Sequence, residues 1–181
     1  ELERRFDAQN PDWDLIHQAL FHENQAVRRC GAGWLELTAP LWSADGQKIL
    51  DFLGLADDQI RSTVIEIVIA ALPNHEALRA DLAEKFLQIF RAPEEHEGAH
   101  DAYARVASEA LLSELQQQLS LDEVMAWLEG GSGGVKVLAG HLLGAYSGAV
   151  EQLGLKGLTA LAQNEVQSAR QAAHALLLSL L

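Results

Sequence analysis

The sequence contains only one cysteine, Cys30, and it has no opening segment in which basic residues precede a short apolar stretch. A lone cysteine cannot form a disulfide within the chain, and the missing segment is the pattern of a secretory signal. We therefore expect an intracellular, cytoplasmic protein. The chain also begins at Glu1 rather than at methionine, which indicates a piece of a longer protein.

Long apolar runs are also missing. The longest, "TVIEIVIAAL" and "ALLLSLL", are much shorter than the roughly 20 residues that a helix needs to cross a bilayer. The sequence therefore predicts no association with membranes.

Basic residues are scarce: 13 Lys and Arg stand against 26 Asp and Glu, which gives a formal net charge of -13. Such a chain repels phosphate backbones, so nucleic acid is a poor candidate partner. The charge favours a basic protein, or a basic domain of the parent chain, as the partner.

Alternating β-branched residues are nearly absent, whereas apolar residues recur at steps of three and four, as in Leu15, Ile16, Ala19 and Leu20. Only "TVIEIVIAAL" is rich in β-branched residues, and it lies inside a longer helical pattern without a period of two. We expect an all-α protein.

Five segments of the chain resemble one another: "AVRRCGAGWL", "QIRSTVIEIV", "YARVASEALL", "GVKVLAGHLL" and "SARQAAHALL". Each places an aliphatic residue directly before a base, and these aliphatic residues are Val27, Ile60, Ala104, Val135 and Ala169. Three of the four intervals are close to 33 residues, and the interval from Ile60 to Ala104 is longer, at 44. Helix N-caps are expected three residues earlier, at Asn24, Asp57, Asp101 and Ser132, with Asn164 as the nearest candidate in the last segment.

Other helical stretches lie between these segments, so the unit is a helix, a short turn and a second helix. The units are expected at residues 11–39, 40–73, 74–118, 119–146 and 147–181. This gives about ten helices in antiparallel pairs, in which the five aliphatic residues are buried.

The capping residue, the aliphatic-base pair and the small apolar residues after it resemble the second helix of HEAT repeats. The resemblance covers nearly the whole chain and implies one domain, residues 1–181, folded as a right-handed α-solenoid, an armadillo-type superhelix, of about five helix pairs. It also implies that the second helices line a concave face and that the bases tie adjacent repeats together. These bases are Arg28, Arg61, Arg105, Lys136 and Arg170.

Positions five or six after the aliphatic residue should project toward that concave face. They include Glu66, Glu109, His141 and His174, which are our candidate partner contacts. The alternative for each is an ordinary solvent-facing side chain.

The stretch "EEHEGAHDAY" contains His96, Glu97 and His100 in the order H-E-x-x-H, the signature of zinc peptidases. The signature requires a helix, because only helical spacing lets both imidazoles reach one metal. Two alternatives stay open: a loop within the long interval, or a helix extended backwards from Asp101 with Pro93 in its first turn. Charged flanking residues and the lack of a third ligand, for which only Glu109 or Glu114 could be proposed, argue against a zinc site. Replacing His96 or His100 by alanine should leave stability and activity nearly unchanged.

Three functions compete. The favoured one is a non-enzymatic scaffold that binds another protein and needs no cofactor. HEAT-like enzymes are a second class, since alkylpurine DNA glycosylases and phycobilin lyases look like arrays of this kind, but the acidity opposes the former and no residue marks a chromophore site for the latter. The zinc peptidase is the third and least favoured.

The last segment is rich in leucine, and an uncapped array end of this kind favours association. We therefore expect a dimer through the C-terminal helix. The residues concerned are Leu176, Leu177, Leu178, Leu180 and Leu181.

Overall fold

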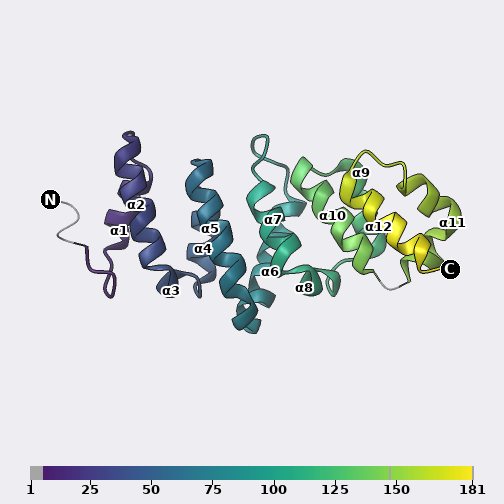
Figure 1. The fold of residues 1–181 in the computed structure, drawn as a ribbon, viewed down its shortest axis with the longest axis horizontal. Coiled ribbons are helices and arrows are strands. Elements are labelled where there is room, and N and C mark those ends of the chain that lie inside the picture. Colours follow the sequence, from purple (N-terminus) through teal and green to yellow (C-terminus); the bar gives the residue numbers. More distant parts are fainter. Residues whose placement is uncertain (1–5, 147, 181) are drawn as a thin grey trace. The chain divides into compact units, whose positions relative to one another are not determined.

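The computed structural model describes residues 6–146 and 148–180. Within these residues the chain forms twelve α-helices and one short 3₁₀ helix, and no strand (Figure 1). This confirms the all-α prediction, including the helical interpretation of "TVIEIVIAAL", which lies in α5 (Asp58–Ala71). No helix in the described part combines the length and the apolar character that crossing a bilayer requires.

The chain divides into two compact units, Glu1–His75 and Glu76–Leu181. The division falls close to the predicted boundary between the second and third helical units, at residues 73 and 74. Each unit is described separately below.

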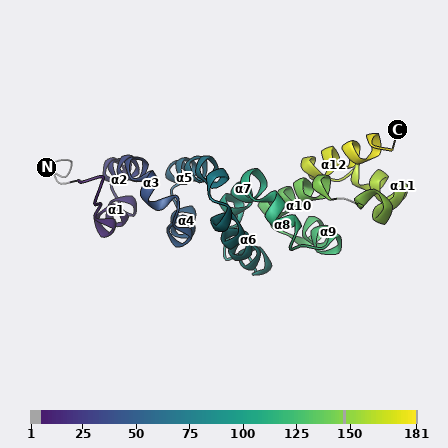
Figure 2. The same ribbon diagram turned by 90° about the horizontal axis from the view of Figure 1, so that it is seen from below.

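The first unit contains five α-helices and a 3₁₀ helix. They are α1 (Trp13–Leu20), α2 (Gln25–Leu37), α3 (Ala39–Trp42), α4 (Gly46–Leu53), α5 and η2 (Leu72–Asn74). α1 packs against α2, α4 packs against α5, and α2 also contacts α5. In Figure 2, α1 and α4 lie on one side of this unit, and α2 and α5 lie on the other.

Short polar side chains start the helices of the first unit. The Asn24 carboxamide oxygen accepts a hydrogen bond from the Ala26 amide at 2.8 Å, as predicted. The Asp57 carboxylate accepts from the amides of Gln59 and Ile60 at 3.1 and 3.2 Å, also as predicted. These bonds satisfy amides that have no partner inside the first turn.

The second unit contains seven α-helices. They are α6 (Glu76–Arg91), α7 (Asp101–Ala110), α8 (Leu112–Gln116), α9 (Leu121–Gly130), α10 (Gly133–Ala145), α11 (Ala149–Leu161) and α12 (Gln167–Leu178). α6 contacts α7, α9 contacts α10, and α11 contacts α12. α10 also packs along α7 and along α12, which makes it the central helix of this unit.

Two of these helices, α3 in the first unit and α8 in the second, go beyond the ten that the repeat pattern predicts. α3 has four residues and α8 has five. Helices this short complete little more than one turn, so they show no apolar periodicity that a sequence pattern could reveal.

The aliphatic residues of the repeat are buried in four of the five segments: Ile60, Ala104, Val135 and Ala169 are each no more than 5% exposed. Val27 is an exception and is only half-buried. It lines a hollow of about 200 Å³ beside α1 and α2. α5 and α10, which correspond to α2, each pack against the second helix of the preceding pair, α2 and α7 respectively. α2 has no such neighbour among the described residues, because no described helix precedes α1.

Asp57 provides a test of how the first unit is held together. Its carboxylate also forms an ion pair with Arg28 of α2, Nε to Oδ2 at 3.0 Å, so one side chain both caps α5 and links it to α2. We expect Asp57→Ala to lower the free energy of unfolding by about 1–2 kcal/mol. Glu66→Gln, which removes one charge from the exposed side of the same helix, should change it little; equal effects of the two variants would contradict the capping role.

The Asp57 contribution should depend on pH. The hydrogen bond from the Ile60 amide is the main cause that lowers the pKa of Asp57; burial opposes it, and the Arg28 guanidinium adds to it. A carboxylate with a lowered pKa stabilises the fold fully above its ordinary pKa and loses this contribution as the pH falls through the folded value. The difference in the free energy of unfolding between wild type and Asp57→Ala, measured by urea titration, should therefore start to shrink as the pH falls below about 4 and vanish only below the lowered pKa of Asp57.

Candidate functional site

The H-E-x-x-H stretch lies in the loop between α6 and α7. Residues 92–100 are not helical, and Gly98 has a left-handed backbone with φ of 82°. His96 is exposed, with its Nδ1 3.3 Å from the carbonyl oxygen of Glu97. The loop alternative is therefore the observed one, and the two imidazoles do not share the helical spacing that the zinc signature needs. Nowhere in residues 6–146 and 148–180 do three or more His, Cys, Asp or Glu side chains form a group that could hold a metal.

The two carboxylates considered as a third zinc ligand have partners elsewhere in the second unit. Glu109 forms an ion pair with Arg105 at 3.1 Å, and Glu114 forms one with Arg79 at 3.2 Å. Both carboxylates are therefore accounted for by bases of the fold.

His100 is buried and connects the loop to the helices around it. Its Nδ1 lies 3.3 Å from the Ser132 hydroxyl, and its ring packs edge-on against Phe90 with the centroids 5.9 Å apart. Its amide donates to the Glu94 carboxylate at 3.1 Å. His100, rather than Asp101, is the N-cap residue of α7, which corrects the predicted cap.

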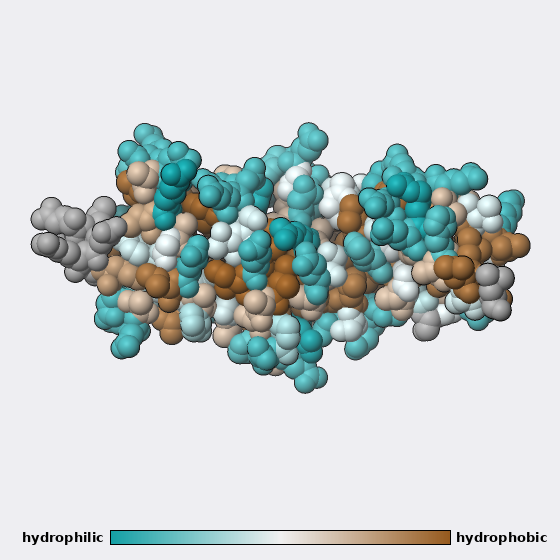
Figure 3. All heavy atoms as spheres, viewed as in Figure 1, coloured by the Kyte–Doolittle hydropathy of each residue, from teal (hydrophilic) through white to brown (hydrophobic). Residues whose placement is uncertain are grey.

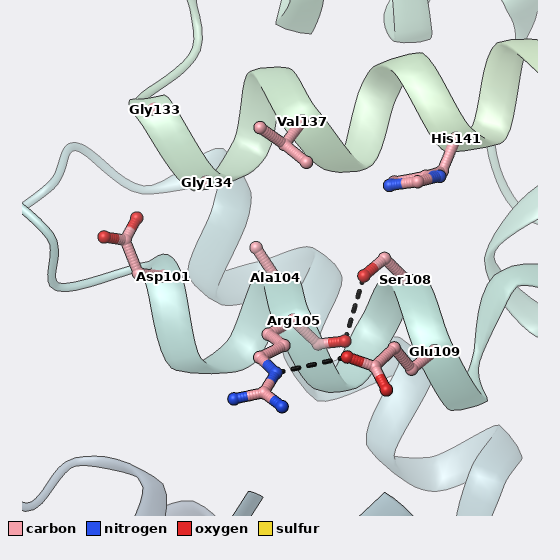
Figure 4. A pocket seen from close by; sticks show the side chains of 9 residues that line it. All are labelled: Asp101, Ala104, Arg105, Ser108, Glu109, Gly133, Gly134, Val137 and His141. Carbon is pink, nitrogen blue, oxygen red and sulfur yellow. Dashed lines mark hydrogen bonds and ion pairs between the residues drawn. The ribbon is translucent and has the colours of Figure 1, made fainter. Parts of the chain in front are cut away.

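A groove of about 470 Å³ lies between α7 and α10 (Figure 4). Side chains and backbone from both helices line it. The α7 residues are Asp101, Ala104, Arg105, Ser108 and Glu109, and the α10 residues are Gly133, Gly134, Val137 and His141.

Small residues bring the two helices together at the start of the groove. A Cβ atom at Gly134 would lie 2.6 Å from the Asp101 carboxylate and 3.2 Å from the Ala104 Cβ. Val137 follows one turn later, and its side chain points toward Ala104 in Figure 4. Although Val137 is apolar, it is 46% exposed.

The polar side chains of the groove differ in whether they already form a hydrogen bond or an ion pair within the chain. Arg105 is neutralised by Glu109 on the same helix, and the Ser108 hydroxyl donates to the Arg105 carbonyl oxygen at 3.0 Å. His141 is exposed at the far end of the groove (Figure 4). The Asp101 carboxylate forms no hydrogen bond or ion pair with any described residue. The groove thus combines an apolar strip with an available carboxylate and an imidazole.

The first unit has a smaller groove of about 220 Å³ in the corresponding place, between α2 and α5. The residues that line the two grooves have the same spacing on α2 and on α7. On α2 they are Gln25, Arg28, Arg29, Ala32 and Gly33. The residues in the same order on α7 are Asp101, Ala104, Arg105, Ser108 and Glu109. In this register Tyr103, not Ala104, corresponds to Val27. The repeat alignment made from the sequence is therefore displaced by one residue in the third segment.

The four predicted partner contacts are distributed over both units. Glu109 and His141 line the same α7–α10 groove. Glu66 on α5 and His174 on α12 are exposed but do not line it. Asp101, Ser108 and Val137 are among the groove residues that the sequence pattern missed, since none of them lies five or six positions after an aliphatic repeat residue.

The five bases of the repeat play different local roles. Arg28 and Lys136 reach the start of the next second helix, where they pair with Asp57 at 3.0 Å and with Glu165 at 3.2 Å. Arg61 and Arg170 form hydrogen bonds with the turn that precedes their own helix. Arg61 donates to the Leu55 carbonyl oxygen. Arg170 donates to the carbonyl oxygens of Asn164 and Glu165. Arg105 forms its ion pair within α7, with Glu109.

The buried position of His100 gives a prediction that replaces the one made from the sequence. His100→Ala removes the contacts with Phe90 and Ser132 and leaves a void, so we expect the free energy of unfolding to fall by about 1–3 kcal/mol. His96→Ala, at an exposed position of the same loop, is the matched control and should change it by less than about 0.5 kcal/mol. Thermal or urea unfolding of the two variants distinguishes them, and a neutral His100→Ala would contradict the structural role.

The α7–α10 groove thus brings an exposed valine, a carboxylate and an imidazole together in the second unit, and a smaller groove lies in the corresponding place in the first. Comparisons of the whole chain with known protein families, curated proteins and solved structures found no match of any kind.

Proposed function

We propose that the chain is a non-enzymatic, HEAT-like repeat scaffold that binds a segment of another protein, or of another domain of the parent chain, in the α7–α10 groove. The repeat interpretation is supported by the helix contacts within each unit. Each second helix packs against its own first helix and also against the neighbouring second helix, as for α2 with α5 and α10 with both α7 and α12. This is the packing by which helix pairs that cannot bury their apolar faces alone form a continuous core.

The chemistry of the groove is the observation on which the binding function rests. The exposed Val137 offers an apolar surface beside the buried Ala104, and Asp101, Glu109 and His141 offer polar groups on its borders. A concave surface with an apolar centre and a few polar groups is suited to the side chains of a protein segment.

Nucleophilic catalysis is less well supported by the same residues. A serine nucleophile needs a hydrogen bond to its base, but the Ser108 hydroxyl donates to the backbone carbonyl of Arg105 instead of to His141. A glycosylase-like or bilin-lyase-like activity has no further support in the groove, and the loop position of His96 and His100 gives none to a peptidase.

Substitution in the groove tests the proposed function. Val137→Glu places a charge on the apolar strip, so we expect it to abolish the capture of partner proteins by the 181-residue chain used as bait. Asp122→Asn, on the exposed first turn of α9 and outside the groove, is the matched control and should capture the same partners as wild type. Circular dichroism verifies that both variants are folded. Retention of every partner by Val137→Glu would contradict the groove as the binding site.

The net charge of -13 predicts a basic partner. Screening weakens attraction between exposed charges over distances of about 10 Å at 0.1 M salt. The captured proteins should therefore be released progressively as the salt concentration rises.

The C-terminal helix supports a separate proposal, dimerisation. Leu178 and Leu180 are 68% and 53% exposed, and Leu155 on α11 is 67% exposed; Leu176 and Leu177 are half-buried, and Leu181 lies outside the described residues. Figure 3 shows hydrophobic surface gathered around α11 and the end of α12. Exposed apolar surface of this kind favours association.

Light scattering tests the dimer. The wild-type chain should show a concentration-dependent rise in mass toward twice 19.7 kDa, and Leu178→Glu should remain monomeric because it places a charge in the apolar surface. Gln171→Glu, on an exposed position earlier in α12, adds the same charge outside the leucine cluster and should dimerise like wild type. A wild type that stays monomeric at high concentration would refute the proposal.

A further inference from the structure

Arg28 on α2 and Arg170 on α12 are held by the same backbone contacts. The Nη1 atom of Arg28 donates to the carbonyl oxygens of the residues six and five positions earlier, at 3.0 and 2.8 Å. The Nη1 atom of Arg170 donates to the carbonyl oxygens at the same two offsets, at 2.7 and 2.8 Å. The two guanidinium groups therefore occupy equivalent places at the start of their helices.

Two bases of the repeat pair in addition with the start of the next second helix. The Nε atom of Arg28 donates to Asp57, the N-cap residue of α5, at 3.0 Å. Lys136 on α10 pairs with Glu165, directly before the N-cap residue of α12, at 3.2 Å. No described helix follows α12, and Arg170 forms no ion pair with a described residue. Its guanidinium is thus suited to a carboxylate at the start of a further second helix.

Apolar side chains accompany Arg170 at this end of the second unit. Leu177 and Leu178 lie about two turns after it on α12, and Leu177 is half-buried whereas Leu178 is 68% exposed. Leu155 on α11, which packs against α12, is also exposed. We call these four residues the C-terminal face.

The start of α2 has the complementary chemistry. Glu23 is exposed and stands directly before the N-cap residue of α2, as Glu165 stands directly before that of α12. Val27 has the place that Ala169 has in α12, where Ala169 is fully buried beside Gly140 of α10. Val27 is instead half-buried and lines the hollow of about 200 Å³ beside α1 and α2. We call Glu23, Val27 and this hollow the N-terminal face.

We propose that copies of the chain associate head to tail, with the N-terminal face of one copy on the C-terminal face of another and Glu23 paired to Arg170. The contact continues the packing of α10 on α12, which the fold already contains. A contact between two copies of α12 would leave the hollow of α2 uncovered. The inference rests on the proposed dimerisation and names the surface of the second copy that the C-terminal helix contacts.

The two faces differ, so a joined pair keeps one free face at each end and the dimer is the first step of a longer assembly. The mass of the wild-type chain should therefore continue to rise beyond twice 19.7 kDa at the highest concentrations. A mass that stays at this value over a tenfold range of concentration would contradict the head-to-tail contact.

Two variants that each lose one face test the proposal directly. Leu178→Glu disrupts the C-terminal face, and Glu23→Arg places a base opposite Arg170. In light scattering, each variant alone should remain monomeric at concentrations where wild type associates. An equimolar mixture should form a dimer and nothing larger, because one intact face of each kind remains. A Glu23→Arg chain that associates like wild type would overturn the proposal.

Further substitutions identify the ion pair. Glu66→Arg, the same charge reversal at an exposed position of α5, is the matched control and should associate within about twofold of wild type. Glu23→Gln and Arg170→Gln should each weaken the association about three- to fivefold, and the double variant should be no weaker than the weaker single variant. Additive effects would refute the pairing. If circular dichroism shows that Arg170→Gln does not fold, the mixture experiment decides by itself.

The outcome is separable from that of the proposed dimerisation. If Leu178→Glu prevents association but Glu23→Arg does not, the C-terminal helix is the dimer contact and only the head-to-tail assignment fails. If the wild-type chain stays monomeric at high concentration, both fail.

Discussion

The close approach of α10 to the helices on its two sides determines the arrangement of the second unit. Gly134 faces α7 and Gly140 faces α12, and a Cβ atom at Gly140 would lie 2.1 Å from the Ser168 hydroxyl and 2.5 Å from the Ala169 amide nitrogen. The Ser168 hydroxyl uses this proximity to donate to the Val137 carbonyl oxygen at 2.9 Å. Because atoms in a packed interior cannot overlap, a side chain at either glycine would force the helices apart.

The groove is a consequence of this packing. Close contact at Gly134 fixes the N-terminal end of α10 against α7, and the groove extends along both helices from this point. Val137 and His141, one and two turns beyond Gly134, therefore line an open space. His100 supports the same arrangement, since its contacts with Phe90 and Ser132 connect the end of α6 and the start of α10 to the start of α7.

The sequence predicted most of the long helices because their signals are local. Helical spacing of apolar residues, and a capping residue before them, can be recognised from a stretch of one or two turns. The caps at Asn24 and Asp57 form as expected. The start of α7 could not be predicted in this way. The N-cap position falls on His100, whose side chain makes no capping hydrogen bond; its ring is instead buried against Phe90 and beside Ser132, which lie 10 and 32 residues away in the chain. Asp101 is a better capping residue by type, so the local rule selected it and displaced the third segment by one position.

That displacement explains which parts of the candidate site were found. Glu109 and His141 were identified because the prediction accepted either five or six positions after the aliphatic residue, so an error of one residue did not matter. The prediction for Arg105 depended on the exact register, and its ion pair differs from those of the other bases. Val137, two residues after the repeat residue Val135, was missed because an apolar residue in such a helix is ordinarily expected in the core. Its exposure follows from the gap between α7 and α10, which only the three-dimensional packing reveals.

Net charge alone does not tell where an acidic protein is able to attract a partner. Asp57 is engaged by two amides and by Arg28, and Asp45 is engaged by Lys48, whose hydrogen bond is the main cause that lowers the pKa of Asp45. Carboxylates held in this way stabilise helix ends and have little capacity left for a second cation. Asp101 differs, since its carboxylate lies at the start of the α7–α10 groove and forms no ion pair with any described residue. Acidic groups of the chain thus differ in whether a base of the fold already pairs with them.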